Sequence, residues 1–96
     1  MIRHICMFTL KDKNKESIIL EFFKRAEQLK ALETIKKFNV VRNAEKPPAS
    51  NYDVALIFDF ETVENLNEYQ KCNQHIEFGE YVSSVRLQRA CIDFEL

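Results

Sequence analysis

His75 and Tyr69 are the residues of this sequence whose types and spacing best suit acid–base chemistry. His75 falls in the first turn of a predicted helix, where the positive end of the helix dipole disfavours a charged imidazolium. We therefore expect an imidazole that is neutral near pH 7 and can accept a proton. Tyr69 lies on the apolar stripe of the preceding predicted helix. A neutral imidazole beside a phenol can remove a proton next to a carbonyl group and stabilise the resulting enolate.

The same residues also have a purely structural explanation. A histidine near a helix start and a tyrosine with an apolar ring are common at the edge of a core, where a backbone carbonyl or a water molecule satisfies them. Spacing alone favours this explanation, because the sequence contains no full catalytic constellation. The other histidine, His4, lies on the first predicted strand and enters the interior if its face of the strand meets the helices.

Metal and cofactor sites have little support in the spacing. The two histidines and the three cysteines lack the spacing of zinc ligands, so we predict no metal site. Gly79 is the only glycine, which excludes the glycine-rich loops that bind phosphates and dinucleotides, and we expect no cofactor. Cys6, Cys72 and Cys91 are odd in number and widely spaced, which predicts reduced thiols and a cytoplasmic location.

Composition predicts one domain over residues 1–96 that binds neither nucleic acid nor a membrane. Fourteen basic and 15 acidic residues give a net charge of -1, without a block of like charge that could follow a phosphate backbone. The N-terminal residues lack the apolar segment and cleavage site of a signal peptide, and no apolar run is long enough to cross a membrane. A domain this small gains stability from a partner.

Hydrophobic patterns predict the order β-α-β-β-α-β. Alternating residues predict strands over 2–10, 38–42, 53–60 and 87–96, with a polar loop at 44–51. Helical spacing predicts an amphipathic helix over 15–32 after an Asn14 cap, then one short helix capped by Thr62 and another capped by Asn73. This order is typical of the ferredoxin-like fold, an α+β protomer whose four-stranded antiparallel sheet carries its helices on one face.

The opposite face of this sheet is predicted to be apolar as well. Its side chains would come from Ile5, Met7, Val41, Ala55 and Ile57. Helices in so short a chain cannot cover both faces of a sheet. A second copy of the sheet would bury these side chains at about 25 cal/mol per Å². We therefore predict a homodimer with its sheets face to face, and an unstable monomer.

These segments together resemble the stress-responsive α/β-barrel (Dabb) family of the dimeric α/β-barrel superfamily. The similar segments are residues 1–5, 41–43, 52–56, 75–79 and 93–96, together with Phe8, Leu10, Phe60, Leu66 and Tyr69, so that the resemblance spans essentially the whole chain. It implies a ferredoxin-like protomer that forms a dimeric α/β barrel. Most members of the family have no assigned reaction.

The enzymatic members resemble plant polyketide cyclases of the olivetolic acid cyclase type, which use a histidine base and a tyrosine partner. His75 and Tyr69 match these positions, and His4 matches a further pocket histidine. The chain departs from the pattern at Ala26, where the cyclase has a tyrosine, and at Cys72 and Asn73, which replace a His-Pro pair. The resemblance implies a pocket lined by Cys6, Phe8, Phe22, Ala26, Leu56, Phe58, Val63, Leu66 and Phe78.

Four functions remain open at this stage. The leading hypothesis is a stress-responsive homodimer without an assigned activity that binds a small apolar or carbonyl-containing molecule in each protomer. The main alternative is a cofactor-free cyclase or lyase, with His75 as general base, Tyr69 on the substrate oxygen and His4 assisting by hydrogen bonding. A monooxygenase-like barrel is disfavoured because the chain has no tryptophan. A structural dimer would have a filled interior, with no cavity beside His75.

Overall fold

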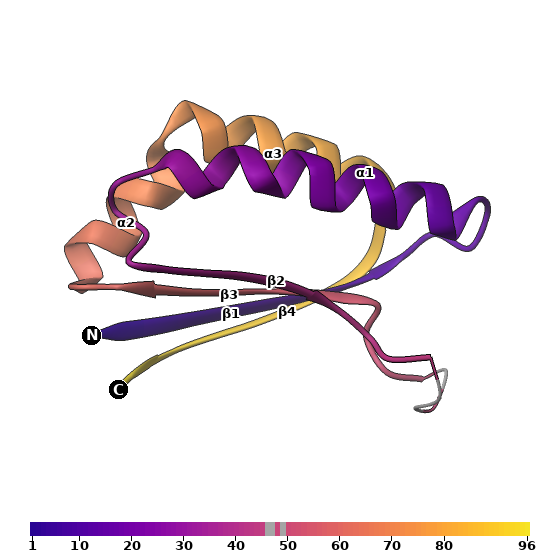
Figure 1. Ribbon diagram of the computed structural model, residues 1–96, viewed down its shortest axis with the longest axis horizontal. Coiled ribbons are helices and arrows are strands. Elements are labelled where there is room, and N and C mark those ends of the chain that lie inside the picture. Colours follow the sequence, from indigo (N-terminus) through magenta and orange to yellow (C-terminus); the bar gives the residue numbers. More distant parts are fainter. Residues whose placement is uncertain (46–47, 49) are drawn as a thin grey trace.

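The computed structural model describes residues 1–45, 48 and 50–96 and shows a sheet covered by helices on one face (Figure 1). The strands are β1 (Ile2–Leu10), β2 (Lys37–Arg42), β3 (Val54–Phe60) and β4 (Arg86–Glu95). The helices are α1 (Lys15–Glu27), α2 (Val63–Lys71) and α3 (Asn73–Val85), and a 3₁₀ turn, η1 (Gln28–Ala31), follows α1. The strand order β2-β3-β1-β4, with antiparallel pairs throughout, confirms the predicted ferredoxin-like fold.

The helix ends differ from the prediction in three places. The first helix ends at Glu27 and continues as a 3₁₀ turn, short of the expected end at residue 32. Asn14 stands before it in the left-handed region, with φ 59°, and its side chain does not cap the helix. Thr62 caps α2 as predicted by accepting a hydrogen bond from the Asn65 amide at 3.1 Å. The predicted Asn73 cap is wrong, because α3 begins at Asn73 and extended Cys72 precedes it.

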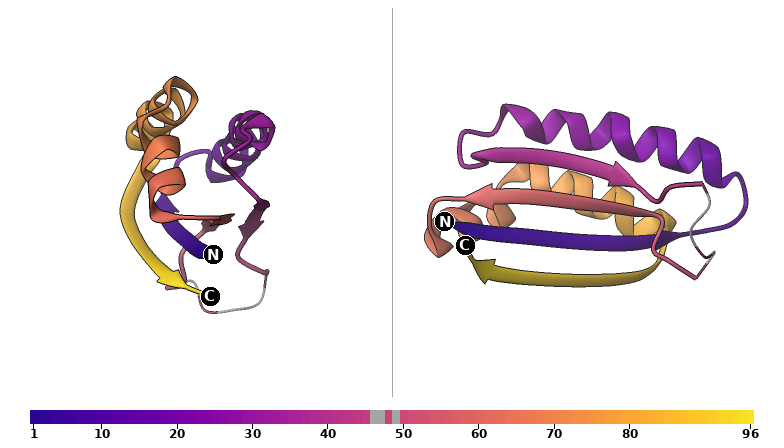
Figure 2. Two further views of the ribbon diagram at one scale, coloured as in Figure 1. Left: turned by 90° about the vertical axis from the view of Figure 1, so that its left-hand side faces the viewer. Right: turned by 60° about the horizontal axis from the view of Figure 1, so that its bottom comes forward.

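Alternation along β1 decides which side chains enter the core. Buried and half-buried residues alternate along its whole length, as the period-two pattern predicts. The buried set includes His4, Cys6 and Phe8, which lie beneath the helices. Figure 2 shows α1 and α3 running side by side across this face of the sheet. The largest fully buried side chains are Tyr69, Phe22, Phe58, Phe60, Leu10 and Leu29.

The face away from the helices is apolar and uncovered. Register places Ile57, Ile5 and Ile92 in one row across β3, β1 and β4. Ile92 is 58% exposed and Phe94 is 38% exposed. In the described part of the chain no helix lies beneath this face (Figure 1). A single copy of the chain therefore leaves an apolar sheet face in contact with water.

A disulfide joins Cys6 of β1 to Cys91 of β4. The two residues are partners in the strand register, and their Cα atoms are 4.2 Å apart. Directly opposed residues of antiparallel strands come this close when they form a non-hydrogen-bonded pair. The prediction of three reduced thiols is therefore wrong, and among the described residues only Cys72 is a free thiol. The pairing was missed because 85 positions separate the two cysteines and only the register brings them together.

Two further expectations concern the loop and the membrane. The predicted polar loop at 44–51 includes residues 46, 47 and 49, which lie outside the described residues. Within the described ranges, no helix is both long and apolar enough to cross a membrane.

Candidate functional site

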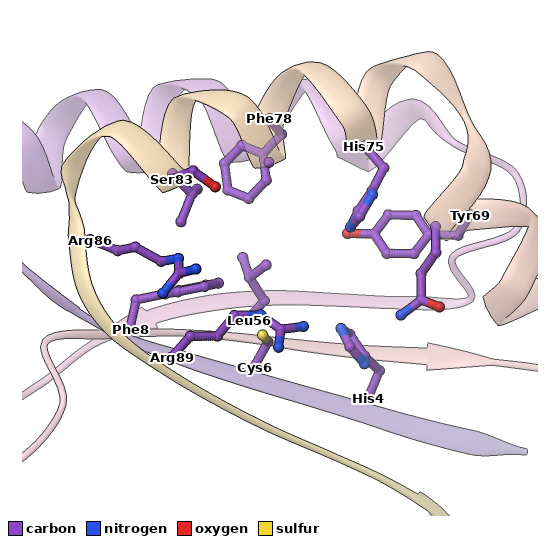
Figure 3. A pocket seen from close by; sticks show the side chains of 13 residues that line it. His4, Cys6, Phe8, Leu56, Tyr69, His75, Phe78, Ser83, Arg86 and Arg89 are labelled. Carbon is purple, nitrogen blue, oxygen red and sulfur yellow. The ribbon is translucent and has the colours of Figure 1, made fainter.

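A cavity of about 160 Å³ lies between the helix-covered face of the sheet and helix α3 (Figure 3). An engineered apolar cavity of about 150 Å³ is large enough to hold benzene, so this space suits a molecule of similar size. Strands β1, β3 and β4 and helices α2 and α3 all contribute to its wall. The lining residues are His4, Cys6, Phe8, Leu56, Tyr69, Gln70, His75, Phe78, Gly79, Val82, Ser83, Arg86 and Arg89.

Only some of the predicted site residues reach this cavity. His4, Tyr69 and His75 all line it, and the predicted lining residues Cys6, Phe8, Leu56 and Phe78 do as well. Val63 does not, because it lies on an exposed side of α2 with 49% of its surface accessible. The remaining four belong to the hydrophobic core and do not line the cavity: Phe22, Ala26, Phe58 and Leu66.

Sequence reasoning missed six lining residues. Gly79 and Val82 follow His75 at helical spacing on one side of α3, and this spacing was a usable signal. Gln70 and Ser83 are sequence neighbours of Tyr69 and Val82. Arg86 and Arg89 gave no such signal, because their position depends on how β4 pairs with β1, where Arg89 faces Phe8.

The hydroxyl of Tyr69 is buried and has no hydrogen-bond partner among the described residues. Its ring packs against the rings of His75 and His4, with centroid separations of 4.7 and 6.3 Å. Burial raises the pKa of the Tyr69 hydroxyl far above its usual value. The phenol is therefore neutral at physiological pH and free to donate a hydrogen bond into the cavity.

His75 likewise has a buried nitrogen, Nδ1, that no other residue in the described ranges hydrogen-bonds. Burial lowers the pKa of His75, the Gln70 backbone partly opposes this shift, and the electrostatic influence of His4 and Arg89 adds to it. The imidazole is consequently neutral at pH 7 and can accept a proton. A buried polar atom that lacks a partner costs about 1–3 kcal/mol, so a ligand that paired with both orphaned atoms would recover this energy.

His4 is held by a carboxylate from the neighbouring strand. Its Nδ1 lies 2.5 Å from Oδ1 of Asp93, the residue opposite it in the β1–β4 register. An ionised carboxylate can only accept, so Nδ1–H donates this bond and Nε2 is left as an acceptor. Figure 3 shows the His4 ring rising from β1 toward the cavity. Asp93 thus fixes the orientation of a third polar group in the site.

The structure brings one set of possible metal donors together. The donor atoms of His4, Cys6 and Cys91 lie within 4.8 Å of one another. The two sulfurs are bonded to each other, so that neither is a thiolate able to bind a metal. In the disulfide form this set offers a single nitrogen ligand.

Gly79 lies on the cavity wall with open space in front of it. A Cβ atom added there would meet nothing within 4 Å, and the backbone does not have a positive φ. We expect Gly79→Ala to stabilise the protein by about 1 kcal/mol, because alanine is the better helix former. Gly79→Leu should instead fill the cavity and abolish ligand binding. Urea unfolding and ligand titration check these outcomes, and loss of the folded state in Gly79→Ala would contradict the first.

The family comparison follows from this geometry and fold. Residues 2–96 match the model of the Stress responsive A/B Barrel Domain, Dabb. The chain belongs to the Dabb family. No match was found among curated proteins.

Solved structures similar to this Dabb chain agree on its architecture. A Dabb family protein from Mesorhizobium loti is 22% identical, with a TM-score of 0.83 over 99% of this chain and 95% of that chain. A dimeric ferredoxin-like protein of unknown function from Thermobifida fusca is 22% identical, with a TM-score of 0.89 over 99% and 90%. A hydroxynitrile lyase from Passiflora edulis is 13% identical, with a TM-score of 0.83 over 97% and 90%. At these identities the similarity supports the fold alone.

Proposed function

We propose that this Dabb protein is a cofactor-free enzyme that removes a proton from a small carbonyl compound, with His75 as the general base. The observation that carries the proposal is the pair of buried, unpartnered atoms on one cavity wall, Nδ1 of His75 and the hydroxyl oxygen of Tyr69. One is a proton acceptor and the other a hydrogen-bond donor. A substrate that satisfied both would place its acidic C–H bond and its carbonyl oxygen side by side.

The proposed step needs no oxidant or metal. The C–H bond next to the carbonyl breaks, the proton passes to Nδ1 of His75, and the electron pair forms the C=C bond of an enolate. Tyr69 donates a hydrogen bond to the enolate oxygen, while Nε2 of His4 accepts one from a substrate hydroxyl or a water molecule. The enolate then attacks a second carbonyl, as in a cyclase, or expels a leaving group, as in a lyase.

A binding protein without turnover is the second candidate. The observation that favours it is the apolar part of the wall, where Phe8, Leu56, Phe78 and Val82 line the cavity. Such a wall contributes binding energy to any apolar ligand, whether or not a reaction follows. This candidate and the enzyme differ in what His75 does.

The His75→Ala variant tests whether the protein is an enzyme with His75 as its general base. We expect turnover to fall by about 10²–10⁴-fold, which is the usual contribution of a general base, while the dissociation constant changes much less. The assay screens small ketones and aldehydes for enzyme-dependent exchange of the α-proton with deuterium, and calorimetry measures binding. Lys71→Ala, on the exposed side of α2, is the matched control. Turnover that survives in His75→Ala contradicts the catalytic proposal, and binding without turnover in the wild type favours the second candidate.

The pH dependence of the reaction follows from the lowered pKa of His75. The base works only when it is unprotonated, so kcat/KM should be constant near neutral pH and fall below the folded-state pKa. Since burial holds this pKa below 6.5 and the charge of Arg89 adds to the shift, we expect activity to persist to a more acidic pH than a solvent-exposed histidine would allow. A pH–rate profile whose acid limb lies above pH 7 would exclude His75 as the base.

We also propose that the protein works as a homodimer through its apolar sheet face. The row of Ile57, Ile5 and Ile92 and the exposed Phe94 support this assembly. Two sheets packed face to face remove such side chains from water, and a twofold axis lets the same face serve both copies. The Thermobifida fusca relative is described as dimeric. In this arrangement the cavities lie on the helix side of each sheet, away from the interface.

A further inference from the structure

We infer that the cavity selects a small carboxylate, with Arg86 and Arg89 binding its anionic group. This inference rests on the proposed function and makes its substrate an oxo acid, in which a carboxylate and the reacting carbonyl are carried on one short apolar body.

The charge on the cavity wall is positive and unbalanced. Of the 13 lining residues two are arginines and none is an aspartate or a glutamate. Asp93 does not line the cavity, and its carboxylate is paired with the His4 ring. A cavity with two guanidinium groups and no internal counter-charge favours an anionic ligand over a neutral one of the same shape.

Arg86 and Arg89 differ from the other arginines, because neither has a carboxylate partner within the described part of the chain. Arg3, Arg25 and Arg42 each form an ion pair, with Asp59, Glu21 and Glu16 respectively. Among the residues that the structure describes, no carboxylate lies within ion-pair distance of Arg86 or Arg89. Their guanidinium donors are therefore available to a ligand.

The placement of the two arginines suits a ligand with an anionic end. Figure 3 shows Arg86 and Arg89 entering the cavity from the β4 side, with Tyr69 and His75 toward the other end. In the same view Leu56 and Phe78 lie between the two ends, and Phe8 lies beside Arg86. A ligand lying along the cavity can thus hold its carboxylate at the arginines and its carbonyl at the phenol.

Shape and size favour a carboxylate over a bulkier anion. A guanidinium group offers parallel N–H donors that match the two oxygens of a carboxylate. The volume of about 160 Å³ leaves room for roughly one ring or a short carbon chain, and little for a phosphate group in addition. We therefore assign the anionic subsite to a monocarboxylate.

Binding measurements with matched probes test the inference. The probes are 4-oxopentanoate, its neutral amide 4-oxopentanamide and inorganic phosphate, each titrated by calorimetry into the wild-type protein at low and high salt. We expect the acid to bind at least tenfold more tightly than the amide, with a preference that decreases as salt rises. Equal binding of acid and amide, or tighter binding of phosphate than of the acid, would overturn the inference.

Variants that remove one positive charge show which residues cause the preference for the acid over the amide. Arg86→Gln and Arg89→Gln should each reduce the preference for the acid by about tenfold or more, whereas Arg86→Lys should keep part of it. Arg42→Gln removes an equal charge from an arginine that pairs with Glu16 outside the cavity, and should leave the preference unchanged. Thermal unfolding verifies that each variant is folded. An unchanged preference in both folded glutamine variants would refute the assignment.

The outcomes also separate this inference from the proposed function. A wild-type enzyme that turns over neutral carbonyl compounds through His75 but shows no acid preference keeps the catalytic proposal and refutes the carboxylate subsite. A protein that binds the acid through both arginines without any turnover keeps the carboxylate subsite and refutes the catalytic proposal.

Discussion

Ile57→Asp is expected to convert the proposed homodimer into monomers at micromolar concentration. Ile57 lies at the β3 end of the apolar row, with Ile5 beside it in the register. By twofold symmetry the substitution places two carboxylates in one interface. Burying an unpaired charge costs several kcal/mol, so the dimer dissociation constant should rise by at least about 1000-fold. Sedimentation equilibrium of the wild type and the variant measures this change.

The control for this experiment is Val63→Asp. It makes a comparable apolar-to-acidic change at an exposed position of α2, on the helix side of the sheet, and should leave the dimer intact. We further expect Ile57→Asp to unfold at a lower denaturant concentration, because the separated protomer leaves its sheet face in water. A wild-type protein that sediments as a folded monomer at micromolar concentration would contradict the assembly itself.

The strand faces could be predicted from the sequence because the alternation in β1 is long and regular. A period of two assigns every residue of that strand to a face once a single residue is placed, and the burial of His4, Cys6 and Phe8 follows this assignment. Helix ends were harder to predict from the sequence. Asn73 has the chemistry of a cap, yet the chain turns one residue earlier, at Cys72. Such a shift depends on backbone geometry that residue type does not determine.

The site residues likewise divide into those that a local sequence pattern predicts and those that only the folded backbone brings together. His75 and Tyr69 could be selected from residue chemistry and helical pattern, which act over short stretches of sequence. Asp93 and Arg89 could not, since they reach His4 and the cavity only through the pairing of β4 with β1, which joins opposite ends of the chain. Resemblance to a family predicts which face of the sheet a side chain lies on, but not whether that side chain reaches the cavity. Phe58 shows this limit, being fully buried in the core without reaching the cavity.

Reduction of the disulfide between Cys6 and Cys91 should lower the stability of the protein by a large amount. The bond closes a loop between positions 85 apart, and chain entropy predicts about 4–5 kcal/mol of stabilisation for a loop of this length. Residual structure in the unfolded chain reduces this value, so we expect a measured loss of about 2–4 kcal/mol. Urea unfolding with and without a dithiol reductant measures the difference.

Cysteine variants connect this stability to the site. Cys91→Ser should reproduce the loss and make the protein insensitive to the reductant, whereas Cys72→Ser, which removes the free thiol, should keep the sensitivity. Because Cys6 lines the cavity and Asp93 reaches His4 from β4, loosening β4 should also weaken ligand binding. Reduction that changed neither stability nor binding would show that the pairing of β1 with β4 holds the site without the covalent bond. A coupled loss would make the thiol state of these two cysteines a determinant of activity.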